Sequence, residues 1–521
     1  MPPLLTKTRV LAMLDSYIKR ILDARIYDLA VETPLDYAKS ISRRLNNSIY
    51  IKREDLQPVF SFKIRGAYNK LLKLSESEKA KGVVAASAGN HAQGLAYSAQ
   101  HLGVSATIVM PKTTPAIKVN AVRGFGANVI LHGDMFDEAS RYAQNLVKEK
   151  GYTYIPPYDD PDVIAGQGTV AMEILRQHPK HIDAIFVPVG GGGLAAGVVA
   201  YIKYVRPNIK VFAVEPEDAA CLKLAMEAGR REVLSEVGIF ADGVAVAQIG
   251  EAPFEVLKDT IDGVITANTD EICAAIKDIF EDTRSIAEPA GALSLAGLKK
   301  YVEQNGAKDK TLIAIDSGAN TNFDRLRYIS ERTEIGERRE AIIAVEIPEK
   351  PGAYAQFCSD LGQRNITEFN YRFTTSDKAH IFVGIQVSHG GNGRQELVDE
   401  LAQKGYKVVD LTDNEVAKLH IRYMVGGHRP IVEGKPLTER VYRFQFPERP
   451  GALLKFLKHL AGRWNISMFH YRNHGSAFAR ILVAMQIPEN EIETAEAFLR
   501  SLDGYRLWDE TDNEAYRLFL A

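Results

Sequence analysis

The sequence has few of the residues and runs that mark secreted, metal-bound or membrane-embedded proteins. Only three cysteines occur among 521 residues, at Cys221, Cys273 and Cys358. They lie far apart and lack CxxC or histidine spacing, so the pattern predicts neither a disulfide framework nor a structural zinc site and favours a reducing compartment. No apolar run reaches the ~18 residues that a helix needs to span a bilayer. We therefore expect a cytoplasmic protein that does not associate with a membrane.

The chain also lacks an excess of charge of one sign. Its 64 lysines and arginines nearly balance its 66 aspartates and glutamates, which leaves a formal net charge of -2. Such a balance creates no extended field to attract nucleic acid or a membrane surface, so a small molecule is the better expectation for a partner. Hydrophobic residues make up 46% of the sequence and charged residues 25%, which is ordinary for a globular protein of several domains.

Beyond about residue 48, short apolar runs alternate with helical patterns. The clearest units pair expected strands at 83–86, 106–110 and 128–131 with expected helices at 90–102, 115–124 and 136–150, respectively. Strand followed by helix, repeated, predicts an α/β fold with a parallel sheet and helices on both faces. In such sheets ligands bind in the loops at the carboxyl ends of the strands.

An amphipathic helix is expected earlier, over residues 11–26. Five apolar residues fall on one side of it, namely Leu11, Leu14, Ile18, Ile21 and Leu22. Spacing of this kind favours packing of that side against a core, with a partner surface as the less favoured alternative.

One lysine stands out because of its position in residues 61–67 (SFKIRGA). A lysine amine reacts with an aldehyde only when it is deprotonated, and desolvation or neighbouring cations favour that state. Taken alone, Lys63 is a weak candidate, because most basic residues are simply solvated. Its weight comes from three later motifs.

The first later motif, residues 87–91 (SAGNH), follows the expected strand at 83–86 and opens a helix. The exposed backbone N–H groups and the helix dipole would form an anion site suited to a substrate carboxylate. A helix cap made by Ser87 or Asn90 is the alternative, and for an isolated motif it would be the better interpretation.

Two more motifs end apolar strand patterns. Residues 190–194 (GGGGL) lead into a helix, and glycines there let the backbone wrap closely around a phosphate; a flexible loop is the weaker alternative. No GxxxxGK[ST] motif occurs, which argues against a nucleotide. Ser317 follows the apolar run 312–315 and would place a hydroxyl at the edge of the sheet, although a turn serine alone would explain it.

In this order across residues 1–330, the four motifs resemble the fold-type II pyridoxal-phosphate (PLP) enzymes. Residues 87–94 (SAGNHAQG), 163–169 (VIAGQGT) and 288–292 (EPAGA) are similar to the threonine/serine dehydratase group. The resemblance implies that Lys63 and Ser317 are catalytic. The implied cofactor-binding set is Phe62, Lys63, Asn90, Gly190, Gly191, Gly192, Gly193, Leu194 and Ser317. The implied substrate-binding set is Ser87, Ala88, Gly89, Asn90 and His91.

Within this resemblance, Lys63 holds the cofactor aldehyde, Asn90 bonds the phenolic oxygen and Ser317 faces the pyridine nitrogen. A hydroxyl cannot enforce a proton on that nitrogen, so negative charge stays near the substrate Cα and β-elimination is favoured over transamination. Lys63 would take the Cα proton, and loss of the substrate hydroxyl and then of ammonia would give a 2-oxo acid.

Two departures from related families narrow the activity. Serine racemases carry a second serine where this chain has Ala88, and alanine cannot move a proton. Racemase-like relatives also coordinate a divalent cation with a glutamate and an aspartate; here Glu215 is present but Cys221 replaces the aspartate, and a thiol is a poor ligand for a hard cation. We expect no divalent metal and leave a monovalent ion open.

The C-terminal part of the sequence repeats. Residues 347–353 (IPEKPGA) recur as 446–452 (FPERPGA), and 365–367 (NIT) recur as 465–467 (NIS). Each copy has the order βαββαβ of a ferredoxin-like module, and the pair resembles the ACT-like regulatory domains of biosynthetic threonine dehydratases. A highly charged stretch before them predicts a linker or exposed helix.

The expected organisation has four parts. They are a catalytic domain over 1–324, a linker over 325–340, and ACT-like regulatory modules over 341–424 and 425–521. The resemblance implies conversion of L-threonine to 2-oxobutanoate and ammonia, inhibition by isoleucine, opposition by valine, and a homotetramer. Two alternatives stay open: a dehydratase of the same fold that prefers L-serine, and an amino-acid sensor without catalytic activity.

Overall fold

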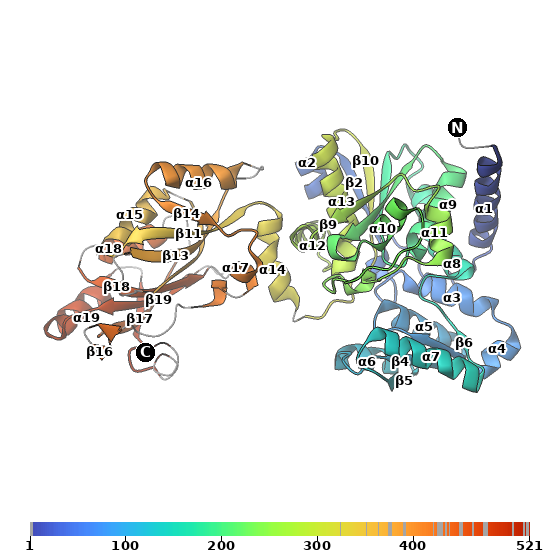
Figure 1. Cartoon of the computed structure of the whole chain (residues 1–521), viewed down its shortest axis with the longest axis horizontal. Helices are drawn as coiled ribbons and strands as arrows, with labels where there is room; N and C mark the ends of the chain where they lie inside the picture. Colours follow the sequence, from blue (N-terminus) through green and yellow to red (C-terminus); the bar gives the residue numbers. More distant parts are fainter. Residues whose placement is uncertain are drawn as a thin grey trace. The chain divides into compact units, whose positions relative to one another are not determined.

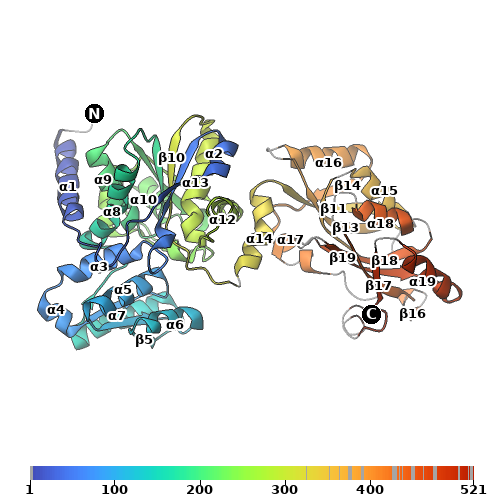
Figure 2. The same cartoon turned by 180° about the vertical axis from the view of Figure 1, so that it is seen from behind.

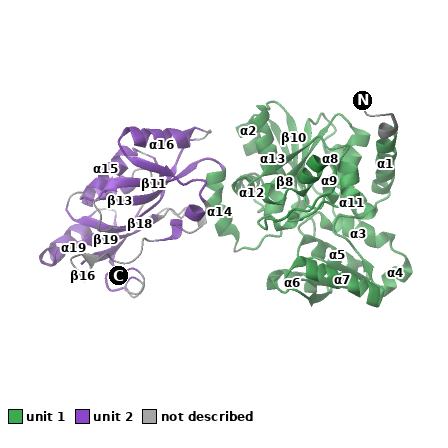
Figure 3. Cartoon of the chain, in the orientation of Figure 1, with its two compact units in different colours: residues 1–336 green, residues 337–521 purple. Residues whose placement is uncertain are grey.

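The computed structural model describes the chain from residue 4 to residue 520. Within that span it leaves out residues 324, 351, 363, 373–377, 389–391, 420, 425–430, 433–434, 437, 448–451, 461–462, 473–477, 503–504, 514–515 and 517–519. The chain divides into two compact units, Met1–Gly336 and Glu337–Ala521 (Figure 3). No helix in the described part of the chain is long and apolar enough to cross a membrane.

The first unit contains a large sheet of six strands (Figure 1). In spatial order these are β1 (Leu35–Tyr37), β2 (Ser48–Arg53), β10 (Thr311–Asp316), β7 (Ala184–Pro188), β8 (Lys210–Pro216) and β9 (Gly263–Ala267). All neighbours are parallel except β1, which runs antiparallel to β2. The carboxyl ends of five strands therefore lie at the same edge of the sheet.

The same unit contains a second, smaller sheet, to which β5 belongs (Figure 2). All its neighbouring strands are parallel. Its strands are, in spatial order, β5 (Asn128–Leu131), β4 (Ala106–Met110), β3 (Val83–Ala86) and β6 (Thr153–Tyr154). The predicted strands at 83–86, 106–110 and 128–131 are confirmed residue for residue.

Helices cover both sheets of the first unit. They are α1 (Leu4–Leu22), α2 (Lys39–Leu45), α3 (Lys63–Lys73), α4 (Glu76–Lys81), α5 (Asn90–Leu102), α6 (Ala116–Gly124), α7 (Phe136–Lys150), α8 (Pro161–Gln177), α9 (Gly193–Val205), α10 (Cys221–Ala228), α11 (Glu251–Leu257), α12 (Thr269–Thr283), α13 (Pro289–Asn305) and α14 (Arg325–Gly336). Short 3-10 turns are η1 (Glu54–Leu56), η2 (Glu217–Ala219) and η3 (Asp242–Val244).

Both faces of the large sheet are buried, as β10 shows. Ile313 and Ile315 pack with α8, α9 and α11 on one face, while Leu312 and Ala314 pack with α12 and α13 on the other. A strand covered on both sides needs an apolar residue at every position, which explains the continuous apolar run in the sequence. The expectation of a parallel sheet with helices on both faces is confirmed.

Helix α1 differs from its predicted form. It ends at Leu22, and only Leu14, Ile18 and Ile21 of the expected face are buried, whereas Leu11 and Leu22 are 60% and 64% exposed. The helix packs against α8, α9 and α11 with part of its surface only, so the buried stripe is narrower than the apolar side of the sequence pattern. The predicted packing against the core is confirmed for Leu14, Ile18 and Ile21, and it was wrong for Leu11 and Leu22.

Residues 325–336, within the stretch expected to be a linker or exposed helix, form α14, which packs against α12. Ile329 and Ile335 are buried there, and Arg332 forms an ion pair with Asp270 at 2.5 Å. The segment is thus an ordered part of the first unit, and strand β11 already begins at Glu340.

The second unit is built on one antiparallel sheet of eight strands. In spatial order these are β14 (Lys407–Asp410), β11 (Glu340–Pro348), β13 (Lys378–Gln386), β12 (Ile366–Arg372), β18 (Asn465–Arg472), β19 (Phe478–Gln486), β17 (Arg440–Pro447) and β20 (Arg506–Asp509). Each half has the predicted order βαββαβ, and the halves join through β12 and β18. Two equivalent modules therefore share one sheet.

The helices of the second unit pack on this sheet through one apolar core. They are α15 (Ala353–Asp360), α16 (Gly393–Gln403), α18 (Ala452–Leu460) and α19 (Ile492–Arg500). The segment between the modules contains α17 (Glu415–Leu419), η4 (Ile421–Tyr423), β15 (Ile431–Val432) and β16 (Lys435–Pro436), and η5 (Glu489–Glu491) precedes α19.

Candidate active site

Lys63 is the first residue of α3 and lies beside the turn after β10. Ser61 forms an isolated antiparallel bridge with Gly318, and the backbone N–H of Phe62 donates to the carbonyl of Ser317 at 3.2 Å. These two backbone links bring Lys63 and Ser317, 254 positions apart in the sequence, to the same edge of the large sheet. The Lys63 Nζ atom lies 5.2 Å from the centre of the Phe62 ring.

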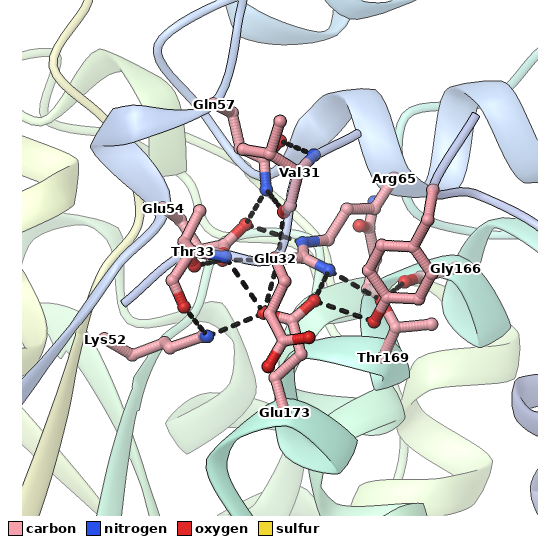
Figure 4. Close-up of polar contacts among 12 residues, drawn as sticks. Val31, Glu32, Thr33, Lys52, Glu54, Gln57, Arg65, Gly166, Thr169 and Glu173 are labelled. Atoms are coloured by element: carbon pink, nitrogen blue, oxygen red, sulfur yellow. Dashed lines mark hydrogen bonds and ion pairs between the residues drawn. The ribbon is translucent and has the colours of Figure 1, made fainter. Parts of the chain in front are cut away.

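A fully buried charge network fixes α3 behind Lys63 (Figure 4). The Arg65 guanidinium donates to Glu54 Oε2 at 2.7 Å and to Glu173 Oε1 at 2.5 Å, and Lys52 Nζ donates to Glu173 Oε2 at 2.6 Å. All four side chains have no exposed surface. Two cations and two carboxylates balance each other, so the network ties β2, η1, α3 and α8 together without leaving an unpaired buried charge.

The environment of Lys63 favours its neutral amine. Burial lowers the pKa of Lys63 to about 8, although the carboxylate of Glu288 acts in the opposite direction. The Nζ atom donates one hydrogen bond, to the carbonyl of Pro157 at 2.9 Å. An amine with this pKa is deprotonated in a useful fraction of molecules near neutral pH, which nucleophilic attack on an aldehyde requires.

The four glycines after β7 form a tight turn into α9. Gly192 has a φ of +90° and precedes the first residue of the helix. A Cβ on Gly191 would lie 2.2 Å from the Tyr158 ring, and one on Gly190 would lie 2.8 Å from Val244 Cα. Only glycine fits this turn, and the first N–H groups of α9 have no intrahelical partner and can bind an anion.

Asn90 opens α5 and is held by two other polar side chains. Its Nδ2 donates to Glu288 Oε1 at 2.6 Å, and Asn320 Nδ2 donates to Asn90 Oδ1 at 2.8 Å. Burial raises the pKa of Glu288 to about 7, with nearby Asp242 adding to the effect. Ser317 Oγ donates to the carbonyl of Ala290 at 3.2 Å.

The predicted motifs line one closed circuit of contacts. Lys63 contacts Pro157, and the adjacent Tyr158 packs against the glycine turn. On its other side the turn packs against Val244, next to Gly243, which lies beside Glu288. A Cβ on Gly243 would lie 3.3 Å from Glu288 Oε1. The turn 317–320 closes the circuit, because it contacts both Asn90 and the residue before Lys63. The residues of the predicted motifs, far apart in the sequence, thus belong to one continuous series of contacts.

The remaining predicted residues lie in the loop between β3 and α5. Ser87 Oγ accepts from the N–H of Gly89 at 3.3 Å, and a Cβ on Gly89 would meet nothing within 4 Å. His91 is buried, with Nε2 at 2.8 Å from the carbonyl of Ile155. Burial, with help from the charge of Lys63, lowers the pKa of His91 to about 3, so its side chain is a neutral anchor for the loop.

Glu215, considered above as a metal ligand, instead binds backbone. Its two carboxylate oxygens accept from the N–H groups of Leu222 at 2.7 Å and Lys223 at 2.9 Å, at the start of α10. The Cys221 Sγ donates to the carbonyl of Gly190 at 3.4 Å, below the glycine turn. These contacts give both residues a structural role, and the absence of a divalent metal stays a prediction.

Sequence reasoning missed the polar partners of the site. Glu288 was quoted only within the motif 288–292, and no contact with Lys63 or Asn90 was predicted for Asn320, Pro157 or Asp242. Their contacts with Asn90 and Lys63 join positions from 94 to 230 residues apart, so no local pattern could reveal them.

The residues present fit a cofactor that carries an aldehyde and a phosphate. Lys63 supplies an amine of lowered pKa, and the glycine turn supplies a helix N-terminus for an anion. Two buried polar atoms of the same region, Ser61 Oγ and His91 Nδ1, have no hydrogen-bond partner among the described residues. A polar ligand bound here could form hydrogen bonds with these two atoms.

Comparison with known proteins decides the family. The model described as "Pyridoxal-phosphate dependent enzyme" matches residues 26–318, and the one described as "C-terminal regulatory domain of Threonine dehydratase" matches residues 331–421 and 433–520. The L-threonine dehydratase biosynthetic IlvA of Burkholderia multivorans is 54% identical over 508 residues, which cover 97% of this chain and 99% of that protein. The chain belongs to the biosynthetic threonine dehydratase family.

Other members of the threonine dehydratase family agree. The enzyme of the same name from Escherichia coli is 54% identical over 505 residues, which cover 97% of each chain. The processed form of threonine deaminase isoform 2 from Solanum lycopersicum is 50% identical, with a TM-score of 0.60 over 61% of this chain and 93% of that chain. The predictions of a fold-type II PLP-dependent lyase with a C-terminal regulatory part are confirmed.

Proposed function

We propose that this chain catalyses the conversion of L-threonine to 2-oxobutanoate and ammonia, with PLP held by Lys63. The observation that carries the proposal is the position of the Lys63 amine, whose pKa is lowered to about 8, in a closed circuit with the glycine turn, Asn90 and Ser317. The site residues assigned from the sequence keep their proposed roles on this ground.

The roles follow from the chemistry of each group. Bound PLP supplies an electron sink that acidifies the Cα–H bond of an amino acid. The Nζ of Lys63 removes that proton, because its lowered pKa lets it act as a base near neutral pH. The backbone at residues 87–89 and the N-terminus of α5 bind the substrate carboxylate.

Ser317 favours elimination through what its hydroxyl cannot do. The hydroxyl rotates and can either donate or accept, so it cannot hold a proton on a ring nitrogen as a carboxylate would. With PLP bound, negative charge would then stay near the substrate Cα, which would favour loss of the neighbouring hydroxyl over transamination. Ala88, in the position of the second serine of racemases, leaves no base on the opposite side.

We further propose that residues 341–424 and 425–521 are two regulatory modules that bind isoleucine as inhibitor, with valine opposing it. In this domain proposal the catalytic domain covers 1–324, and the connecting segment over 325–340 includes α14, which packs with the first unit, and the first residue of β11. The sharing of one sheet by two equivalent modules supports a pair of effector sites. A homotetramer and a cytoplasmic location are part of the same proposal.

The direct test is a keto-acid assay on the purified full-length protein. We expect a higher kcat/KM on L-threonine than on L-serine, inhibition by isoleucine, and recovery of the activity when valine is added. A higher kcat/KM on L-serine would contradict the substrate assignment. A colourless protein that binds isoleucine but releases no keto acid would identify the chain as a sensor.

A further inference from the structure

A line of side-chain amides ends at the site. Asn320 Nδ2 donates to two acceptors, the carbonyl of Val59 and Asn90 Oδ1, each at 2.8 Å. Asn90 Nδ2 in turn donates to Glu288 Oε1 at 2.6 Å. The same region is braced by backbone, because the N–H of Glu288 donates to the carbonyl of Gly318 at 3.0 Å.

The direction of every hydrogen bond in this line is set by its first acceptor. A backbone carbonyl can only accept, so the NH₂ group of Asn320 must face Val59. The second N–H of the Asn320 amide then points to Asn90, so Asn90 must accept it with its side-chain oxygen. The NH₂ group of Asn90 therefore faces Glu288, and a carboxylate there accepts it. Rotation of the Asn90 amide by 180° would place its oxygen against Glu288 and its NH₂ group against that of Asn320.

The amide of Asn90 has one further hydrogen. Both hydrogens of a carboxamide lie in its plane, so the bond to Glu288 also fixes the direction of the second N–H. No described residue accepts a hydrogen bond from this second N–H. In the proposed function, this hydrogen is the donor for the phenolic oxygen of the cofactor.

We propose that Asn320 and Glu288 are positioning residues that fix the Asn90 amide with its N–H, and not its oxygen, toward the phenolic oxygen of PLP. This inference rests on the proposed function and deepens it. Without the two partners the amide can rotate, and an amide oxygen facing a phenolic oxygen repels it and leaves both acceptors unsatisfied.

Charged groups around Glu288 come from several elements. Lys63 of α3, Asp242 of η3, Lys118 of α6 and Asp316 of β10 all interact with it electrostatically. Asp242 also pairs with Lys118 at 2.6 Å. A test must therefore change the hydrogen-bond direction at Asn320 without changing Glu288 or these neighbours.

Asn320→Asp makes that change at constant size. An ionised aspartate would put an acceptor against the Val59 carbonyl and Asn90 Oδ1, and only its protonated form could donate to Asn90. We expect the affinity of the full-length apoprotein for PLP to fall by about 10–100-fold at neutral pH. The loss should grow as pH rises from about 4 to 6, because an aspartate ionises near pH 4. We also expect a shift in the absorption maximum of the bound cofactor.

Asn47→Asp is the matched control. Like the half-buried Asn320, the buried Asn47 donates twice through its Nδ2, in this case to the backbone carbonyls of Leu45 at 2.6 Å and Ala307 at 2.9 Å. It stands directly before the amino end of β2, whereas the site lies at the carboxyl ends of the strands. We expect Asn47→Asp to lower thermal stability while its PLP affinity and absorption maximum stay those of the unmodified protein. Equal losses of PLP affinity in both variants would reduce Asn320 to a structural residue and overturn the proposal.

Three further variants complete the test. One replaces Asn320→Asp if that variant does not fold, and two test the role of Glu288. Asn320→Ala removes the donor without adding a charge, and we expect the same direction of change in PLP affinity without the added pH dependence. Glu288→Gln keeps an acceptor oxygen for Asn90 and should lose less affinity than Glu288→Leu, which keeps none. The reverse order would contradict the role of Glu288.

The inference and the proposed function fail in different ways. Borohydride reduction of the PLP-loaded protein links the cofactor to the lysine that holds it. If Asn320→Asp binds PLP with unchanged affinity and absorption, and reduction still labels Lys63, the positioning role is wrong and the proposed activity stands. If reduction labels another lysine in the unmodified protein, the proposed site itself is wrong.

Discussion

At the scale of single residues, the site depends on groups held away from their ordinary protonation states. Burial lowers the pKa of Lys63 to about 8 and raises that of Glu288 to about 7. A charged group in a site without water lowers the stability of the apoprotein, so burial favours the neutral amine of Lys63. The neutral amine is the form that attacks an aldehyde.

Replacement of Lys63 by methionine should abolish keto-acid formation and stabilise the apoprotein at neutral pH. The folded pKa of about 8 lies below the ordinary value of 10.5, so the unfolded chain binds more protons between these pH values and the stability of the unmodified apoprotein rises across that window. We expect an advantage of about 1–3 kcal/mol for Lys63→Met at pH 7, measured by urea unfolding.

The advantage should shrink at pH 9.5, where the amine of the unmodified protein is largely neutral. A constant difference between the two proteins at both pH values would show that the amine is not desolvated in the fold.

At the scale of elements, the glycine turn and the helix α3 hold the reacting groups in place. The turn admits no side chain beside Tyr158 and Val244, and α3 is fixed by the buried network around Arg65 and Glu173 (Figure 4). Both are built by contacts between segments far apart in the sequence.

Gly191→Ala should remove PLP affinity. A Cβ at this position would lie 2.2 Å from the Tyr158 ring, so the turn must open and the N–H groups at the start of α9 lose their direction. We expect PLP titration of the apoprotein to show at least a ~100-fold loss, the equivalent of about 2.7 kcal/mol. Gly124→Ala, where an added Cβ meets nothing within 4 Å, should keep normal affinity.

Glu173→Gln should destabilise the first unit strongly. It leaves Lys52 and Arg65 buried with less negative charge, and removal of one partner from a buried ion pair costs about 3–5 kcal/mol. Glu76→Gln is the control, because it removes only the exposed pair with Lys79 and should change the free energy of unfolding by less than about 0.5 kcal/mol. Similar losses in both variants, measured by denaturant unfolding, would contradict the weight given to the network.

The elements were largely predictable from the sequence, and the polar network was not. Strands β3, β4 and β5 were found because each contains a short run of apolar residues followed by a helical pattern, and α5 and α7 match their expected ranges. The number of buried side chains on α1 was overestimated. Periodicity shows which residues are apolar, but it does not show how many of them the neighbouring helices can cover. Lys52 and Glu173 resemble solvated residues in the sequence, and their pairing depends on contacts 121 positions apart.

At the scale of the whole chain, a catalytic unit is combined with a regulatory unit made of two equivalent modules. The modules share a sheet, and a buried ion pair joins them: Arg372 of β12 donates to Glu439 before β17 at 2.9 Å. Inhibition requires that isoleucine bind the less active arrangement better, and a ratio of ~100 would supply about 2.7 kcal/mol of coupling.

Arg372→Met should weaken regulation and spare catalysis. It leaves Glu439 buried without its cation, so the two modules lose their fixed arrangement. We expect turnover of L-threonine without effectors to be unchanged and the isoleucine concentration for half inhibition to rise by at least ~10-fold, about 1.4 kcal/mol of lost coupling.

Arg364→Met removes a more exposed pair of the same unit, with Glu400, and should leave the inhibition curve in place. If Arg372→Met responds to isoleucine as the unmodified protein does, the ion pair between the modules has no part in the regulation.

The most direct measurement of the central claim is reduction of the PLP-loaded protein with borohydride, followed by peptide mapping. The account predicts one modified residue, Lys63, and loss of keto-acid formation in proportion to the modification. Modification of any other lysine, with Lys63 recovered unmodified, would contradict it.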